Sequence, residues 1–257
     1  MIEIKNLNFA YENSPVLRNI HFKFENPKIY GLFGPNGSGK STLLKCLAGL
    51  LLPQEGDIIF KGHSIKTWKI NEFSKEVAYL PQEHRPFFPY LVKEIVLMGR
   101  TPYIGNVGFG PKADDVEQAR EAMEATGIEH LADKPYTNIS GGERQLVMLA
   151  RGLAQNPSLM LLDEPTLNLD FKNQYTIWEL IKGLSRTKDI TFIIASHDPN
   201  HILWYCDLSL LIHKGEVKAK GIPGQILTKQ NLESLYGIRC DLLTIDDKSF
   251  LYPLFQD

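Results

Sequence analysis

The chain has 257 residues, of which 43% are hydrophobic and 23% are charged, proportions that are typical of a globular protein and exclude an intrinsically disordered one. Its 28 basic and 30 acidic residues give a net charge of −2, which supplies no global basic field and argues against nucleic acid as a partner. No run reaches the ~20 apolar residues that span a bilayer and no signal peptide opens the chain, so we expect any membrane role to come through a separate chain.

The N-terminal segments Ile2–Phe9 and Val16–Phe24 alternate apolar and polar residues. This period of two predicts half-buried antiparallel strands. Asn13–Pro15 between them has the composition of a turn. Ile58–Phe60 predicts a further short strand.

Four later runs are apolar on both faces, which is typical of strands in a parallel sheet that is covered on both sides. These runs are Ile29–Phe33, Leu159–Leu162, Ile190–Ala195 and Leu208–Ile212. Predicted helices alternate with them at Lys40–Leu50, Gly141–Asn156 and Asn173–Leu184. The alternation of strand and helix predicts an α/β fold with right-handed crossovers.

The middle of the chain has a helical pattern, with helices predicted over Leu91–Met98 and Asp114–Thr126. The residues that predict a loop between them are Gly99, Pro102, Gly105, Gly108, Gly110 and Pro111. We interpret this region as a helical insertion. Near the C-terminus we expect a short helix at Gln230–Tyr236 and a hairpin. The prediction is one domain, 1–257, with an α/β core and antiparallel strands at 1–83 and 150–220, a helical subdomain at 84–149 and a C-terminal extension at 221–257.

A phosphate-binding motif lies between a predicted buried strand and a helix. Residues Gly34–Thr42 match G-x-x-x-x-G-K-[ST]. Glycines allow successive N–H groups to point at phosphate oxygens, and the helix start adds its positive end. Lys40 is expected at the β- and γ-phosphates, Ser41 at Mg²⁺ and Thr42 at the α-phosphate. The predicted nucleotide-binding residues of this loop are Gly34, Pro35, Asn36, Gly37, Ser38, Gly39, Lys40, Ser41 and Thr42; the alternative is a chance glycine-rich turn.

Two acids end a predicted buried strand, Asp163 and Glu164. Ligands of open α/β sheets bind at the carboxyl ends of the strands. Asp163 is therefore expected to hold Mg²⁺, and Glu164 to polarise an attacking water. The alternative is an acidic strand end that only begins a loop.

The segment Ser140-Gly141-Gly142-Glu143 precedes a predicted helix. Ser140 and Glu143 match a capping box, which is the alternative interpretation. A capping box does not explain two glycines in the first turn, where they weaken a helix, whereas glycines there allow an anion to approach the backbone N–H groups closely.

Together with the phosphate loop and Asp163-Glu164, this segment resembles the signature of the ATP-binding cassette family over about the first 220 residues, with Ile139 and Glu143 in place of the usual leucine and glutamine. The resemblance implies a P-loop NTPase (RecA-like) core with an N-terminal antiparallel β subdomain and an inserted α-helical subdomain. It implies ATP and Mg²⁺ as cofactors. It also implies a head-to-tail dimer with a second copy of the chain, in which Ser140, Gly141 and Gly142 face the γ-phosphate held by the other copy.

Further positions match the family pattern. Tyr11 resembles the aromatic residue that stacks on adenine, Gln82 resembles the glutamine that touches Mg²⁺ and the water, and His197 resembles the histidine that contacts the γ-phosphate. The alternative for Tyr11 is an ordinary core or surface tyrosine, that for Gln82 is a polar loop residue, and that for His197 is a histidine that caps a strand end. Asp170 resembles an aspartate of a loop that crosses the dimer. Leu167 stands there instead of the family's serine, so no cross-subunit hydrogen bond is implied at that position.

Three segments resemble transporter members of the family. The aromatic segment Phe87–Val92 resembles a groove that accepts a short helix from a membrane subunit; the alternative is ordinary packing of the insertion. Val96–Tyr103 and Ile226–Leu232, with Tyr236-Gly237, resemble the ATPase subunits of importers for iron chelates, haem and cobalamin.

The predicted function is an ATPase subunit of such an importer. It would be peripheral at the cytoplasmic face of the membrane and bound to permease subunits, with a substrate-binding protein as an indirect partner and no nucleic acid. Glu164, His197, Gln82 and Lys40 are the expected catalytic residues. The alternatives are a soluble cassette ATPase, as in iron–sulfur cluster assembly, a non-hydrolysing binding module and a P-loop kinase.

The cysteines and histidines show no spacing of zinc ligands. We therefore expect no zinc site. We expect the cysteines to be reduced thiols in a core; they are Cys46, Cys206 and Cys240.

Overall fold

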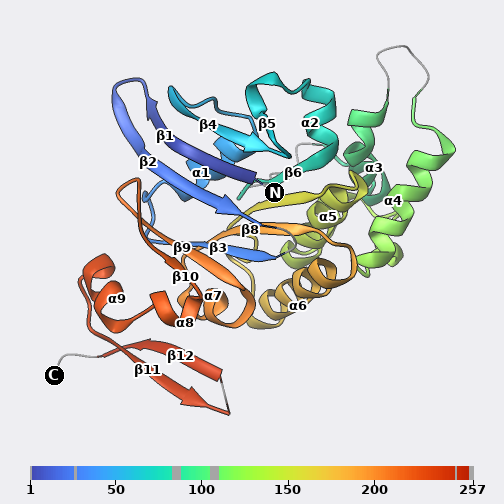
Figure 1. Cartoon of the computed structure of the whole chain (residues 1–257). Coiled ribbons are helices and arrows are strands. Elements are labelled where there is room, and N and C mark those ends of the chain that lie inside the picture. The colour runs from blue at the N-terminus through green and yellow to red at the C-terminus, as the bar shows by residue number, and fades with distance from the viewer. Residues whose placement is uncertain (1, 26–27, 83–87, 105–109, 247, 255–257) are drawn as a thin grey trace.

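The structure is a computed structural model that describes residues 2–25, 28–82, 88–104, 110–246 and 248–254 (Figure 1). Its N-terminal sheet has the strand order β2-β1-β4-β5 and is antiparallel. The strands are β1 (Ile2–Tyr11), β2 (Ser14–Phe24), β4 (Glu55–Phe60) and β5 (His63–Ser64). Ile4 pairs with Phe22 on one side and with Ile58 on the other, and all three side chains are buried. The predicted antiparallel strands are confirmed.

The large sheet has the order β10-β9-β3-β8-β7-β6, and every neighbouring pair is parallel except β10 with β9. Its strands are β3 (Ile29–Phe33), β6 (Val77–Leu80), β7 (Leu159–Asp163), β8 (Thr191–Ser196), β9 (Leu208–His213) and β10 (Glu216–Gly221). Every residue of β3, β7 and β8 is buried, as a sheet covered on both faces requires. This confirms the predicted α/β fold class.

Helices cover both faces of the large sheet (Figure 1). The α-helices are α1 (Lys40–Leu47), α2 (Ile70–Glu76), α3 (Val92–Leu97), α4 (Ala113–Ala125), α5 (Gly141–Ala154), α6 (Phe171–Thr187), α7 (Pro199–Tyr205), α8 (Pro223–Ile226) and α9 (Lys229–Tyr236). Short 3₁₀ helices are η1 (Ile65–Thr67), η2 (Met98–Tyr103), η3 (Glu129–Leu131) and η4 (Tyr136–Asn138). A two-stranded hairpin, β11 (Cys240–Ile245) with β12 (Lys248–Pro253), follows α9.

The large sheet separates two hydrophobic cores, because alternate residues of a strand face opposite sides. Leu161 and Ile193 face a core that includes α1 and the antiparallel sheet. Leu162 and Ile194 face a second core that includes residues of α3 to α7. Helix α1 is therefore enclosed between two sheets, and the loop that precedes it is fixed by packing on both sides.

Several elements were not predicted, because each has a weak sequence pattern. Helix α2 has one buried residue, Phe73; β6 has only four residues, α7 has only seven, and β10 is an edge strand with no fully buried residue. The loop predicted from Gly99 is wrong for the segment up to Tyr103, which is helix η2. Gly105 and Gly108 lie outside the described residues. The three cysteines are buried free thiols as expected, and burial raises the pKa of Cys46 to about 12.

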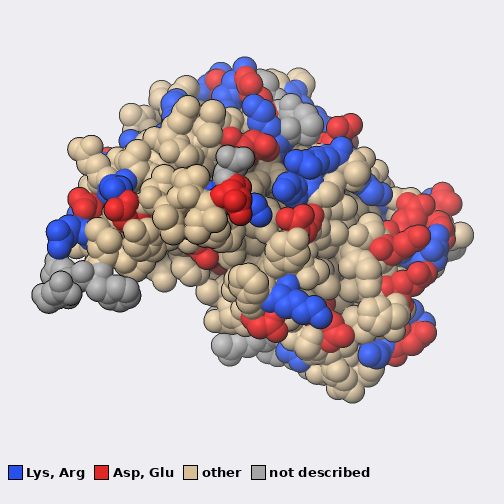
Figure 2. Space-filling model, turned by 90° about the horizontal axis from the view of Figure 1, so that it is seen from below, with Lys and Arg blue, Asp and Glu red and all other residues tan. Residues whose placement is uncertain are grey.

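Helix α4 is acidic on its exposed face and forms an acid-rich edge of the molecule (Figure 2). On this face Arg120 pairs with Glu117 at 2.7 Å and with Glu124 at 3.3 Å. A different ion pair is buried at the start of the same helix. Arg100 Nε lies 3.0 Å from Asp115 Oδ1, with 8% and 7% of the two side chains exposed.

The buried pair connects three elements. The Nη1 atom of Arg100 donates to Ala154 O at 2.8 Å, and the Asp115 carboxylate accepts from Lys112 N at 3.0 Å. The guanidinium also stacks 3.7 Å above the Tyr103 ring centroid. These contacts explain why the glycine- and proline-containing segment before Ile104 is an ordered helix rather than a loop.

We predict that Arg100→Met lowers the free energy of unfolding by about 3 kcal/mol, because it leaves the Asp115 carboxylate buried without its cation. Urea unfolding of the full chain measures this change. Arg120→Met is the matched control, and it should leave the urea midpoint nearly unchanged because exposed ion pairs contribute little. Equal midpoints for the two variants would contradict the structural role of the Arg100–Asp115 pair.

Candidate functional site

The loop from β3 to α1 is shaped by glycines. Gly37 and Gly39 have φ of 77° and 105°, in the left-handed region that glycine adopts without steric cost. A Cβ atom on Gly39 would lie 2.9 Å from Leu17 Cδ2 and 3.2 Å from Val16 O. The backbone conformation of Gly39 therefore favours glycine, and the close approach of β2 adds to that preference.

Lys40 begins α1 and its side chain is buried. Its Nζ atom donates to Gly34 O at 2.7 Å and to Pro35 O at 3.2 Å, and it lies 3.8 Å from Glu164 Oε1. Burial lowers the pKa of the Lys40 ammonium, while the carboxylates of Glu164 and Asp163 act in the opposite direction. The loop thus holds a desolvated cation at its centre.

Asp163 is the last residue of β7 and is buried. Ser41 Oγ donates to its Oδ1 at 2.9 Å, and Tyr79 OH donates to its Oδ2 at 3.4 Å. Burial raises the pKa of Asp163, and the hydrogen bond from Ser41 opposes that rise. Tyr79 was not predicted as a partner of this carboxylate. The only feature of the sequence that could have indicated it is the hydroxyl group of a tyrosine near the end of a short apolar run.

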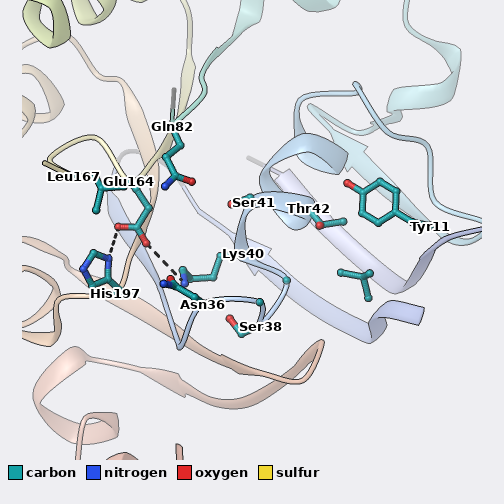
Figure 3. Close-up of a pocket in the computed structure, with 13 residues that line it drawn as sticks. Tyr11, Asn36, Ser38, Lys40, Ser41, Thr42, Gln82, Glu164, Leu167 and His197 are labelled. Carbon is teal, nitrogen blue, oxygen red and sulfur yellow. Dashed lines mark hydrogen bonds and ion pairs between the residues drawn. The ribbon is translucent and has the colours of Figure 1, made fainter. Parts of the chain in front are cut away.

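Glu164 lies between two nitrogen-bearing side chains (Figure 3). Its Oε2 is 2.8 Å from His197 Nδ1, and its Oε1 faces Lys40 as described. The backbone of Glu164 has φ of 51°, a left-handed conformation that is unfavourable for a residue other than glycine and that is concentrated at functional sites. Its N–H donates to Ala195 O at 3.1 Å, which fixes this turn to the end of β8.

Lys40, Glu164 and His197 line one cavity of about 530 Å³, a size that suits a small-molecule ligand, whereas Asp163 is not among its lining residues. The lining residues are Tyr11, Val16, Asn36, Gly37, Ser38, Gly39, Lys40, Ser41, Thr42, Gln82, Glu164, Leu167 and His197. Figure 3 shows Tyr11 at one end and Gln82, Glu164 and His197 at the other. The Tyr11 ring packs edge to face on Phe9 at 4.9 Å. Val16 and Leu167 were not predicted as lining residues, because an apolar residue has no motif that distinguishes it from core.

The signature residues lie apart from this cavity in the same chain. Ser140, Gly141 and Gly142 begin α5 and do not line the cavity. Ser140 Oγ accepts from Glu143 N at 3.3 Å, and Ser140 N donates to Glu143 Oε2 at 2.7 Å, so the capping box is present. A Cβ atom on Gly142 would meet the Asn173 side chain within 2.8 Å, whereas one on Gly141 would make only an ordinary contact at 3.8 Å.

The predicted loop aspartate caps the next helix. Asp170 Oδ1 accepts from Asn173 N at 2.8 Å at the start of α6. Its other oxygen accepts from Asn173 Nδ2 at 3.0 Å. The same asparagine therefore lies between Asp170 and Gly142, which connects the starts of α5 and α6.

The parallel sheet, the glycine loop and the acids at the strand ends define a P-loop nucleotide-binding protein. Residues 17–167 match the family model described as ABC transporter. The chain belongs to this family and binds ATP.

Similar proteins cover nearly the whole chain. The petrobactin import ATP-binding protein FpuC of Bacillus anthracis is 35% identical over 98% of this chain and 93% of its own length. The ferric enterobactin transport ATP-binding protein FepC of Escherichia coli is 35% identical over 96% of this chain and 90% of its own. A solved structure described as a transporter of the metal-chelate type, in an inward-facing conformation, has a TM-score of 0.87 and 31% identity, with 99% of this chain and 97% of that chain covered. The predicted fold class and the predicted ATPase of the cassette family are thereby confirmed.

We predict that Lys40→Met weakens ATP binding about 100-fold, because a hydrogen bond from a charged donor contributes about 1.5–3 kcal/mol and the apolar side chain cannot donate one. Equilibrium titration with a fluorescent ATP analogue measures the change. Lys69→Met, at an exposed lysine, is the matched control and should bind normally. Unchanged affinity in a folded Lys40→Met chain would refute phosphate binding by Lys40.

Proposed function

We propose that this chain is the ATP-hydrolysing subunit of an importer that takes up a metal chelate through a separate membrane protein. The observation that supports hydrolysis most directly is the Glu164 carboxylate, which lies 3.8 Å from Lys40 Nζ and 2.8 Å from His197 Nδ1 at the wall of one cavity. The cargo class is supported by the similarity to the petrobactin and ferric enterobactin proteins and to the metal-chelate type transporter.

In this proposal Glu164 is the general base that accepts a proton from the attacking water. His197 orients the Glu164 carboxylate and contacts the terminal phosphate, and Gln82 holds the water. Lys40 and the amides of the loop bind the phosphates. Tyr11, at the opposite end of the cavity, stacks on the adenine ring.

A divalent cation fits the oxygen atoms at the end of β7. Ser41 Oγ and Asp163 Oδ1 are 2.9 Å apart, and Mg²⁺ prefers such hard oxygen ligands, one or two of them from the protein. We assign Ser41, Asp163 and the Gln82 carboxamide as the residues that hold Mg²⁺ or its waters. When bound, the ion neutralises charge on the phosphates.

A second copy of the chain completes the site in this proposal. Helix α5 begins with amides that no carbonyl of its own helix can satisfy, and these amides lie outside the chain's own cavity. Ser140, Gly141 and Gly142 of one copy therefore bind the terminal phosphate in the cavity of the other, as a helix N-terminus binds an anion. The exposed, unobstructed Gly141 supports this close approach.

A membrane protein docks beside the start of α3 in this proposal. Phe88 and Tyr90 are 64% and 45% exposed, with ring centroids 6.0 Å apart; Phe87, which was also expected here, lies outside the described residues. A groove of about 390 Å³ near α2 and η2 includes Leu50 and Met98, both of which are exposed. The lining of this groove combines such apolar side chains with polar ones, among them Arg151 and Gln155, and a groove of mixed character suits an amphipathic helix.

The described part of the chain contains no helix that is both long enough and apolar enough to cross a membrane. On the strength of its similarity to the import ATP-binding proteins, we propose that the chain is peripheral at the cytoplasmic face of the membrane, where its membrane partner holds it. We propose that the chain divides into a core at 1–83 and 150–220, a helical subdomain at 84–149 and an extension at 221–257. Closure of the dimer on ATP would move the docking groove together with the helical subdomain.

We predict that Glu164→Gln lowers kcat for ATP hydrolysis about a thousandfold, because the amide cannot accept the proton of the water. With Mg-ATP the same variant should sediment as a dimer in analytical ultracentrifugation. Adding Gly141→Glu to the Glu164→Gln chain should return it to a monomer, because the new carboxylate would repel the phosphates bound by the other copy. The substitution should not destabilise α5, since acidic residues are favourable in the first turn of a helix. Glu72→Gln, at an exposed acid, is the control and should hydrolyse ATP at the normal rate. A normal rate for Glu164→Gln would exclude Glu164 as the general base.

We also predict that Phe88→Glu with Tyr90→Glu lowers the membrane-bound fraction of the chain in cell fractionation, because two charges replace the apolar docking surface. The rate of ATP hydrolysis by the isolated chain should not change. Tyr175→Glu, at an exposed tyrosine of α6, is the matched control. A wild-type chain found entirely off the membrane would instead favour an ATPase that is not coupled to transport.

A further inference from the structure

The C-terminal hairpin, β11 with β12, packs against the short helix α7 (Figure 1). A two-stranded hairpin is marginally stable by itself, so its contacts with α7 hold it in position. Trp204 Nε1 donates to Ser249 O at 2.8 Å. The indole also meets the Phe250 ring edge to face, with centroids 5.0 Å apart.

Asn200 makes a second contact, one helical turn closer to the start of α7. Its Nδ2 donates to Leu251 O at 3.1 Å, and its Oδ1 accepts from Leu251 N at 2.8 Å. One strand residue therefore engages both the donor and the acceptor of a single side chain. Such a two-point contact fixes both the distance and the orientation between α7 and β12.

The same asparagine is three residues from His197. Asp198 lies between them and caps α7, because its Oδ1 accepts from Asn200 N at 2.8 Å. Asp198 N in turn donates to Ser196 Oγ at 3.1 Å, at the end of β8. Hydrogen bonds through Asn200 and Asp198 thus connect the hairpin to the end of β8, which His197 follows.

The C-terminal extension also approaches His197 from a second side. An apolar cavity of about 180 Å³ is lined by His197 and by residues of α9 and of the hairpin, among them Tyr236. The Tyr236 ring lies 5.9 Å from Phe33, at the end of β3. Burial, with the charges of Glu164 and Asp198, raises the pKa of Tyr236 to about 12, which agrees with its position beside the site.

We infer that Asn200 is a positioning residue for ATP hydrolysis: by joining α7 to β12 it holds His197 at hydrogen-bond distance from Glu164. This inference rests on the proposed function, in which His197 orients Glu164. None of the described residues of the hairpin lines the nucleotide cavity. The hairpin therefore contributes to the rate of hydrolysis and not to the binding of ATP.

The test is Asn200→Leu in the full chain, a substitution of similar size that removes both hydrogen bonds. We expect kcat for phosphate release to fall about tenfold with the KM for ATP unchanged, because small displacements of catalytic groups reduce rate rather than affinity. Lys229→Met is the control. It removes the ion pair between Lys229 Nζ of α9 and Asp241 of β11 at 2.6 Å, which does not involve α7, and should leave kcat unchanged.

A double-mutant cycle tests whether Asn200 acts through His197. In a His197→Ala chain, Asn200→Leu should have no further effect on kcat, because the group that it positions is gone. A loss of the same size in both backgrounds would overturn the inference, and so would an unchanged kcat for a folded Asn200→Leu chain. If His197→Ala alone left kcat unchanged, the proposed role of His197 would fail, and this inference with it.

Trp204→Phe provides a second variant in case Asn200→Leu does not fold. It keeps an aromatic ring against Phe250 and removes only the hydrogen bond to Ser249 O. We expect a smaller loss, about threefold in kcat, again at constant KM. A kcat equal to that of the unmodified chain would overturn the inference on its own.

Discussion

The carboxylate of Glu164, held between the ammonium of Lys40 and the imidazole of His197, is the interaction on which the site depends. Its three members come from different segments: the turn after β7, the start of α1 and the end of β8. Parallel strands bring these segments to one edge of the sheet. The left-handed backbone of Glu164 is unfavourable by itself, so the hydrogen bond to Ala195 and the packed strands must maintain it.

The two cores explain why the loop before α1 is rigid. Alternate residues of the central strands pack toward α1 on one side and toward α5 and α6 on the other. Helix α1 lies between the sheets, and Gly39 is so close to β2 that a Cβ atom there would require Leu17 and Val16 to shift. The position of Lys40 therefore depends on residues of both sheets, although the motif that predicts it is local.

Local patterns in the sequence predicted the parts of the structure that depend on neighbouring residues. The buried strands, the glycine loop and the capping box at Ser140 belong to this group, because composition and short spacing determine them. Contacts between distant segments were not predictable: Tyr79 reaches Asp163, and Asn200 reaches Leu251, through pairings that only the folded chain creates. Weakly patterned elements such as α7 and β10 were missed because tertiary packing, rather than periodicity, stabilises them.

The nucleotide cavity is bounded by both sheets at once. Tyr11 and Val16 belong to the antiparallel sheet, whereas Glu164 and His197 follow strands of the parallel one. A ligand that fills the cavity contacts both sheets, so its binding stabilises the folded arrangement in which the two sheets lie together. Occupancy then suppresses local opening of the N-terminal strands, and the half-life of the chain against proteolysis depends on the concentration of free nucleotide around it.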